Sequence, residues 1–126
     1  MFVRITIMVM RLCVLIALIL GILFWTRKVV AAGHLLELHM GLGILVALSL
    51  AILGYFIATV KGRNIGLAVG AFVLAICMVA LGFGQQQPIL AGLSFHWIIQ
   101  IVHLLLGLLA IGMGEMIAGR YKRLTR

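Results

Sequence analysis

Four long apolar runs constrain this chain more than any other feature. They cover about residues 5–25, 32–60, 65–83 and 94–119 of a 126-residue chain. Each is long enough to cross a membrane, because about 20 apolar residues at a rise of 1.5 Å span the hydrocarbon of a bilayer. With 66% hydrophobic and 10% charged residues, the composition lies outside that of soluble globular proteins. The sequence predicts one integral membrane domain over residues 1–126, an all-α four-helix bundle in a lipid bilayer.

The basic residues predict how this bundle is oriented. The connection after the first run carries Arg27 and Lys28. The N-terminus, the turn after the second run and the C-terminal tail carry Arg4, Lys61, Arg63, Arg120, Lys122, Arg123 and Arg126. Because cytoplasmic loops are enriched in Lys and Arg, we expect an up-down-up-down, multi-pass protein of the cell (inner) membrane with both termini cytoplasmic. The net charge of +8 is confined to loops and tails, so it sets orientation and does not indicate a nucleic-acid partner.

Histidines inside the second and fourth runs are the main candidates for function. His39 and His103 lie within apolar segments, where polar side chains are costly and are usually functional. In the expected topology these two helices run in the same direction, and His34 and His96 also fall in the outer half. Counted from the outer ends of the runs, His39 and His103 agree in depth to within about one turn. Counted from the basic inner ends, their depths differ by more than a turn.

Each of these two histidines is followed by a glycine one turn later on the same helix face. The patterns are His39-x-x-x-Gly43 and His103-x-x-x-Gly107. A glycine there removes the side chain that would block a flat macrocycle lying against the helix. Two facing histidines with small residues beneath them are what a bis-histidine haem requires.

On these motifs and the hydropathy pattern, the chain resembles the small four-helix transmembrane b-type cytochromes. The resemblance implies a haem b whose iron is held by His39 and His103, with electrons passing to or from a quinone. Members with two haems need ligands at both membrane faces. Since this chain has no histidine in its inner half, the resemblance implies a single haem in the outer half.

Other interpretations of the polar residues stay open. His39 and His103 are also consistent with hydrogen-bonded helix packing, or with another cofactor such as a chlorophyll-type pigment. His34 and His96 suit interfacial polar residues, or hydrogen-bond partners of haem propionates or a quinone carbonyl. Arg27 and Lys28 fit either propionate partners or ordinary interfacial side chains.

A zinc or copper site at the start of the second run is disfavoured by spacing. His34 and Glu37 share a helix face, but His39 points about 140° from His34. Three such side chains on one regular helix do not converge on a metal ion. Cys13 and Cys77 show no metal-ligand spacing, and we expect both to be small buried hydrophobic residues.

Two further features predict how the helices pack. Arg11 and Glu115 lie at similar depths from the cytoplasmic face, and each would be costly alone in lipid. We expect them to form an ion pair between the first and fourth helices, with a protonatable Glu115 as the alternative. Gly66-x-x-x-Gly70 in the third run has the spacing that lets helices approach closely.

The function predicted from these observations is electron transfer by a haem-bearing membrane protein, acting with membrane redox subunits. No nucleophile, base dyad, phosphate loop or dinucleotide fingerprint is visible, which makes a self-contained enzyme a poor fit. The alternative is a structural or pigment-bearing accessory subunit of a larger respiratory or photosynthetic complex. A homo-oligomer is compatible with either. A small multidrug exporter fits less well, because those rely on an acidic residue in the first helix, where this chain has Arg11.

Overall fold

The computed structural model of this protein describes residues 1–87 and 94–125, and these residues form helices joined by short connections. The helices are α1 (Phe2–Trp25), α2 (Gly33–Thr59), α3 (Ile65–Gly84) and α5 (His96–Leu124). All four are long and apolar enough to cross a membrane. The predicted all-α, four-helix class is thereby confirmed, whereas membrane orientation stays a prediction. Arg126 of the basic tail lies outside the described residues.

Local sequence signals explain where the helices begin and end. Gly62 has a φ of 80°, which a glycine adopts without strain, and it forms the turn between α2 and α3. The Asn64 side chain then caps α3 by accepting a hydrogen bond from the Leu67 amide at 2.9 Å. Helix α5 continues beyond Gly119 to Leu124. Lys122 and Arg123 lie in its last turn, where positive charge is favourable to the helix dipole.

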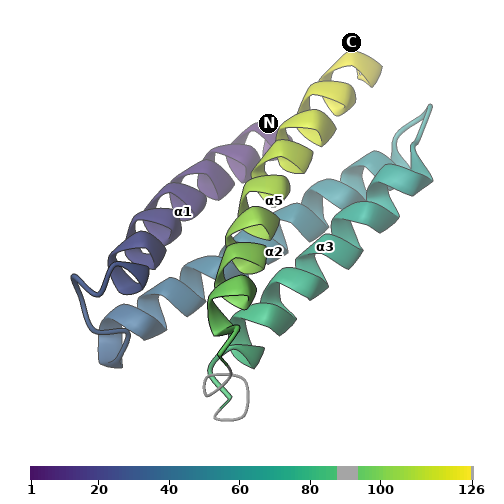
Figure 1. Ribbon diagram of the computed structural model, residues 1–126. Helices are drawn as coiled ribbons and strands as arrows, with labels where there is room; N and C mark the ends of the chain where they lie inside the picture. Colours follow the sequence, from purple (N-terminus) through teal and green to yellow (C-terminus); the bar gives the residue numbers. More distant parts are fainter. Residues whose placement is uncertain (88–93, 126) are drawn as a thin grey trace.

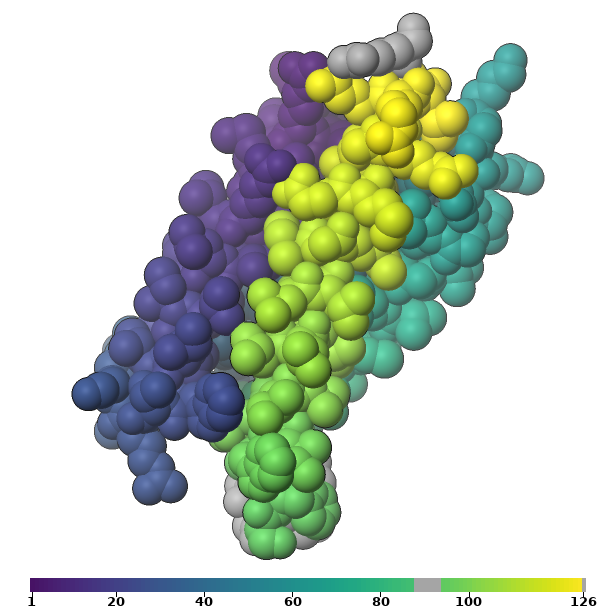
Figure 2. All heavy atoms as spheres, turned by 45° about the horizontal axis from the view of Figure 1, so that its top comes forward, coloured from purple at the N-terminus to yellow at the C-terminus, as the bar shows by residue number. Residues whose placement is uncertain are grey.

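Helix α2 is central to the bundle, because it packs on α1, α3 and α5, while α5 also packs on α1 and α3. Figure 1 shows the two chain ends at the same end of the molecule. The α2–α3 turn lies near that end too, since a Cβ on Gly62 would come 3.1 Å from the Leu124 side chain. Figure 2 shows α5 running along the middle of one face, with α1 beside it.

The half of the bundle near the chain ends is tightly packed. A Cβ added to Gly54 of α2 would come 3.2 Å from Ala71 Cβ and 3.3 Å from the Ala68 carbonyl oxygen on α3. A Cβ added to Gly114 of α5 would come 2.8 Å from Met10 Sδ on α1. The largest fully buried side chains gather in this half: Met10, Leu50, Leu53, Ile57 and Ile117. These contacts hold α1 close to α5, and α2 close to α3.

Two packing predictions were wrong at one of their two residues. In the Gly66-x-x-x-Gly70 pattern, a Cβ on Gly70 would lie 3.6 Å from Met113 Cε on α5, but Gly66 is exposed and has only the Asn64 side chain near its Cβ position. Cys77 is exposed, whereas Cys13 is buried as expected. Both errors have one cause, which is the rotation of α3 about its axis. That helix packs through its buried residues Ala68, Ala71, Leu74, Ala75 and Met78, and this face excludes positions 66 and 77.

Candidate functional site

A cavity of about 330 Å³ lies in the half of the bundle away from the chain ends. It is lined by the last part of α1, the first part of α2, the end of α3 and the first part of α5. Figures 1 and 2 show α1 and α5 close together near the chain ends and further apart in this half. The cavity wall is mainly apolar, with histidine and glutamine side chains among its lining residues.

His39 of α2 and His103 of α5 meet at this cavity. Their ring centres are 6.4 Å apart, and the ring planes are tilted by 56°. Both side chains line the cavity and both residues are half-buried. The two histidines therefore lie at the same depth in the bundle, as the count from the ends of the runs away from the chain termini predicted.

Both imidazoles carry a buried polar atom that has no partner. His39 Nδ1 and His103 Nδ1 are shielded from solvent and make no hydrogen bond with the described residues. The His39 ring also lies close to the backbone of Ala17 in α1. An unpaired buried nitrogen is unfavourable in an apolar surrounding, and a ligand that accepts its lone pair would remove that cost.

Two glycines on neighbouring helices make the space that the imidazoles occupy. A Cβ on Gly21 of α1 would lie 3.4 Å from His39 Cε1, and a Cβ on Gly82 of α3 would lie 3.2 Å from His103 Cε1. Phe24 of α1 adds an edge contact to His39, with ring centres 5.7 Å apart. Sequence reasoning missed all three residues. The two glycines are visible only as small residues inside apolar helices, which does not reveal a partner helix, and Phe24 is one of many apolar residues in its run.

The two glycines that follow the histidines in sequence have a different role. Gly43 and Gly107 line the cavity, and a Cβ at either position would meet no atom within 4 Å. Each therefore leaves space beside its histidine. The imidazole rings therefore lie against Gly21 and Gly82, where a Cβ would contact them. The cavity is empty beside Gly43 and Gly107, where a Cβ would contact nothing.

The distance between the two ring centres is one that would allow both imidazoles to bind one metal ion. Two metal–nitrogen bonds of about 2.0–2.1 Å, with about 1.1 Å from each nitrogen to its ring centre, place the ring centres about 6.3 Å apart. The observed distance is 6.4 Å. The residues present therefore fit a bis-histidine haem.

No known protein family, curated protein or solved structure matches this chain. Its function is therefore inferred from the site itself. Within residues 1–87 and 94–125, no group of three or more His, Cys, Asp or Glu side chains is placed to hold a metal ion. Two histidines alone would not complete the coordination of an iron ion, so any haem proposal needs a macrocycle to supply the remaining ligands.

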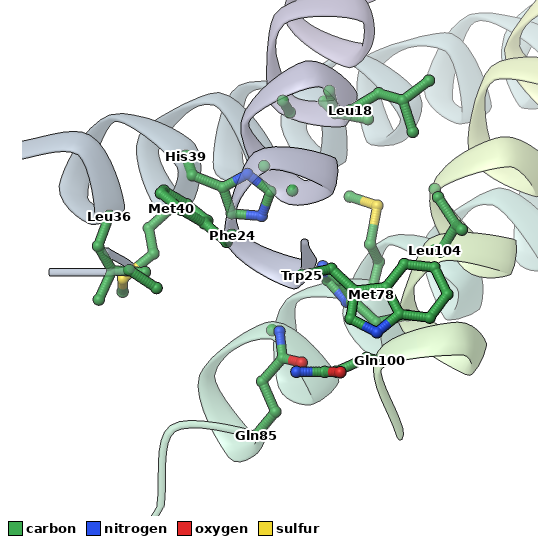
Figure 3. A pocket seen from close by; sticks show the side chains of 18 of the residues that line it. Leu18, Phe24, Trp25, Leu36, His39, Met40, Met78, Gln85, Gln100 and Leu104 are labelled. Carbon is green, nitrogen blue, oxygen red and sulfur yellow. The ribbon is translucent and has the colours of Figure 1, made fainter. Parts of the chain in front are cut away.

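The other sequence candidates divide into those at the cavity and those away from it. His96 lines the cavity together with Gln100 of α5 and Gln85 beside α3. Figure 3 shows the Gln85 and Gln100 amides directed toward the same part of the cavity. The exposed His34 instead contacts Glu37, with 3.3 Å between His34 Nδ1 and Glu37 Oε2.

Arg27 and Lys28 do not reach the cavity. Both are exposed in the connection between α1 and α2, and neither belongs to the cavity lining. Arg27 has a φ of 56°, so the chain turns sharply directly after α1. The structure places a polar edge of the cavity at Gln85, His96 and Gln100 instead.

Arg11 and Glu115 are brought together far from this cavity, in the tightly packed half. Arg11 Nε donates to Glu115 Oε1 at 2.5 Å, and Arg11 Nη2 donates to Glu115 Oε2 at 2.8 Å. This is the two-pronged geometry that a guanidinium and a carboxylate prefer. It joins α1 to α5 at the surface of the bundle.

Proposed function

We propose that this protein binds one haem b in the cavity and transfers electrons near the outer face of the membrane. The observation that carries the proposal is the pair of half-buried imidazoles on α2 and α5, 6.4 Å apart, each with an unpartnered Nδ1. When bound, haem supplies one-electron redox chemistry that no side chain of this protein provides.

The side chains around the cavity have distinct roles in this proposal. His39 and His103 would hold the iron, and Gly21 and Phe24 of α1 pack against the His39 ring and orient it. Gly43 and Gly107 leave room for the macrocycle. Gln85, His96 and Gln100 form the polar edge that faces the haem carboxylates or a quinone carbonyl.

The membrane setting completes the proposal. We place the protein in the cell membrane with both termini cytoplasmic, because seven basic residues flank the side of the chain ends and two flank the other side. In that orientation the cavity lies in the outer half. A quinone or a neighbouring redox subunit then exchanges electrons with the haem through the apolar wall.

The test is the haem content of the purified full-length protein, expressed with haem supplied. We expect about one haem per chain in the wild type and a sharp absorption band on reduction by dithionite. His39→Ala and His103→Ala should each lose the haem. His34→Ala is the matched control, because His34 is exposed and does not line the cavity.

Two outcomes would overturn the proposal. A colourless wild type would favour a cofactor-free accessory subunit whose histidines only connect helices. Haem retained at the wild-type level by both alanine variants would show that other groups hold it.

A further inference from the structure

The Arg11–Glu115 pair lies on the outer surface of the bundle. The two side chains are 56% and 43% exposed, even though they form both hydrogen bonds of a bidentate pair. The contact between Met10 and Gly114 is the cause, since these residues pack tightly between α1 and α5. The next residue along each helix is then directed to the side of this contact, away from the bundle core.

The pair also lies inside the membrane. Arg11 is six residues beyond the start of the first apolar run, and Glu115 is four residues before the end of the fourth. At 1.5 Å per residue, the two lie about 9 Å and 6 Å inside these runs. Since a run of about 20 apolar residues spans the hydrocarbon, both lie inside its cytoplasmic edge.

The internal ion pair leaves polar capacity unused. A guanidinium has five N–H donors and a carboxylate about four acceptor sites, and the pair uses two of each. Acyl chains offer no partner for the remaining donors and acceptors. A polar group at this depth is costly when it faces lipid, so polar groups inside membranes usually face other parts of the protein.

A shallow apolar groove lies on α5 about one turn from Glu115. It lies over Gly112, between Leu108 and Met116, and neither Arg11 nor Glu115 belongs to its lining. A Cβ on Gly112 would meet no atom within 4 Å, so the α5 backbone is accessible there. On α1, Met8 and Leu12 are exposed on the same side as Arg11. A glycine of this kind lets another helix approach closely.

We propose that this face binds a second copy of the same chain, forming a two-fold dimer about the Arg11–Glu115 pair. Charge complementarity favours a second copy over another partner. An arginine beside a glutamate is self-complementary, because a two-fold axis near the pair places each Arg11 next to the Glu115 of the other protomer. Four alternating charges then use the donors and acceptors that lipid would leave unpaired. The Gly112 grooves of the two protomers face each other across the axis.

Cysteine cross-linking tests this arrangement in the full-length protein reconstituted in lipid vesicles. Cys13 and Cys77 are first replaced by alanine, and Gly112→Cys or Ile76→Cys is then introduced. Ile76 is the matched control, because it is 68% exposed on α3, which is outside the proposed interface. We expect rapid disulfide-linked dimers from Gly112→Cys and at least tenfold fewer from Ile76→Cys.

The mass of the protein in detergent, measured over a range of concentrations, gives the second readout. We expect a dimer that Gly112→Trp weakens at least tenfold, while Val73→Trp on the exposed face of α3 leaves it unchanged. Exchanging the charges in Arg11→Glu/Glu115→Arg should preserve the dimer, whereas Glu115→Gln alone should weaken it. A wild type that stays monomeric, or that cross-links through residue 76, would overturn the proposal. Neither readout needs haem, so failure of the dimer leaves the haem proposal unaffected.

Discussion

The polar side chains lie on the outside of the bundle in one half and point into its interior in the other. Near the chain ends, Arg11 and Glu115 form an ion pair on the outside of a close-packed core. In the other half, His39 and His103 point inward, each with an unpartnered nitrogen beside an empty volume. The interior of the first half is filled by side chains, whereas that of the second has the features of a binding site.

The difference arises from how glycine is used. In the packed half, atoms of neighbouring helices lie close to the Cβ positions of Gly54 and Gly114, so each glycine allows two helices to approach closely. In the cavity half, Gly43 and Gly107 face open space. The same residue type therefore serves helix packing in one half and ligand space in the other. Larger side chains should therefore lower stability in the packed half and lower ligand binding in the cavity half.

The largest effect is expected in the packed half. Gly54→Leu forces a side chain against Ala71 Cβ and the Ala68 carbonyl, neither of which has a flexible end that can move aside. We expect a loss of at least about 2 kcal/mol in the free energy of unfolding. Gly43→Leu adds the same volume to open space on the same helix and should leave stability within about 1 kcal/mol of the wild type. Thermal denaturation in detergent measures both, and equal losses would contradict the division into two halves.

Gly43→Leu should act on binding instead. Its side chain occupies part of the cavity, so we expect haem affinity to fall more than about tenfold, or roughly 1.4 kcal/mol. Gly41→Leu is the control, because Gly41 is exposed on the same helix and lies outside the cavity lining. Titration of the haem-free protein with haem gives both affinities. A Gly43→Leu protein that binds like the wild type would show that the macrocycle lies elsewhere.

A smaller effect is expected from the ion pair. Arg11→Gln or Glu115→Gln leaves one charge without its partner at the outer surface of the four-helix bundle, and each should lower the melting temperature by several degrees. The double variant should lose less than the sum of the two single losses, because it leaves no unpaired charge. The melting temperatures of the wild type, the two single variants and the double variant form a double-mutant cycle that measures the coupling between the two residues. Strictly additive losses would mean that the two residues act independently.

The smallest effect is expected from Gly82→Ala. Its Cβ would lie 3.2 Å from His103 Cε1, so the ring must shift by a few tenths of an ångström. Displacing a side chain from its preferred rotamer costs about 0.5–1.5 kcal/mol, which corresponds to roughly a two- to tenfold loss of haem affinity. Gly41→Ala, in open space, should bind normally. No change with Gly82→Ala would mean that α3 does not position the His103 ring.

The sequence predicts the helices of this protein well, because length and hydropathy alone decide whether a segment can cross a membrane. It also identifies the helix face shared by His39 and Gly43, since periodicity along one helix is regular. The rotation of each helix against its neighbours is not contained in that periodicity. For this reason Gly21 and Gly82 were missed, and Gly66 and Cys77 were assigned to the wrong side of α3.

Connections are the other part that the pattern does not determine. Arg27 and Lys28 are close to the cavity along the chain, but neither belongs to its lining, to which the same connection contributes Ala31. Gln85 and Gln100 reach the cavity from two different elements. In each case the path of the backbone between helices, rather than distance along the sequence, decides which polar groups reach the cavity.

The most direct test of the proposed site is the electron paramagnetic resonance spectrum of the oxidised, haem-loaded protein. Two imidazole ligands make ferric haem low-spin, so the wild type should show a low-spin signal that His39→Ala and His103→Ala each abolish, while His34→Ala keeps it. A high-spin signal from the wild type would contradict the proposed site, because it would mean that the two rings, 6.4 Å apart, do not hold one iron between them.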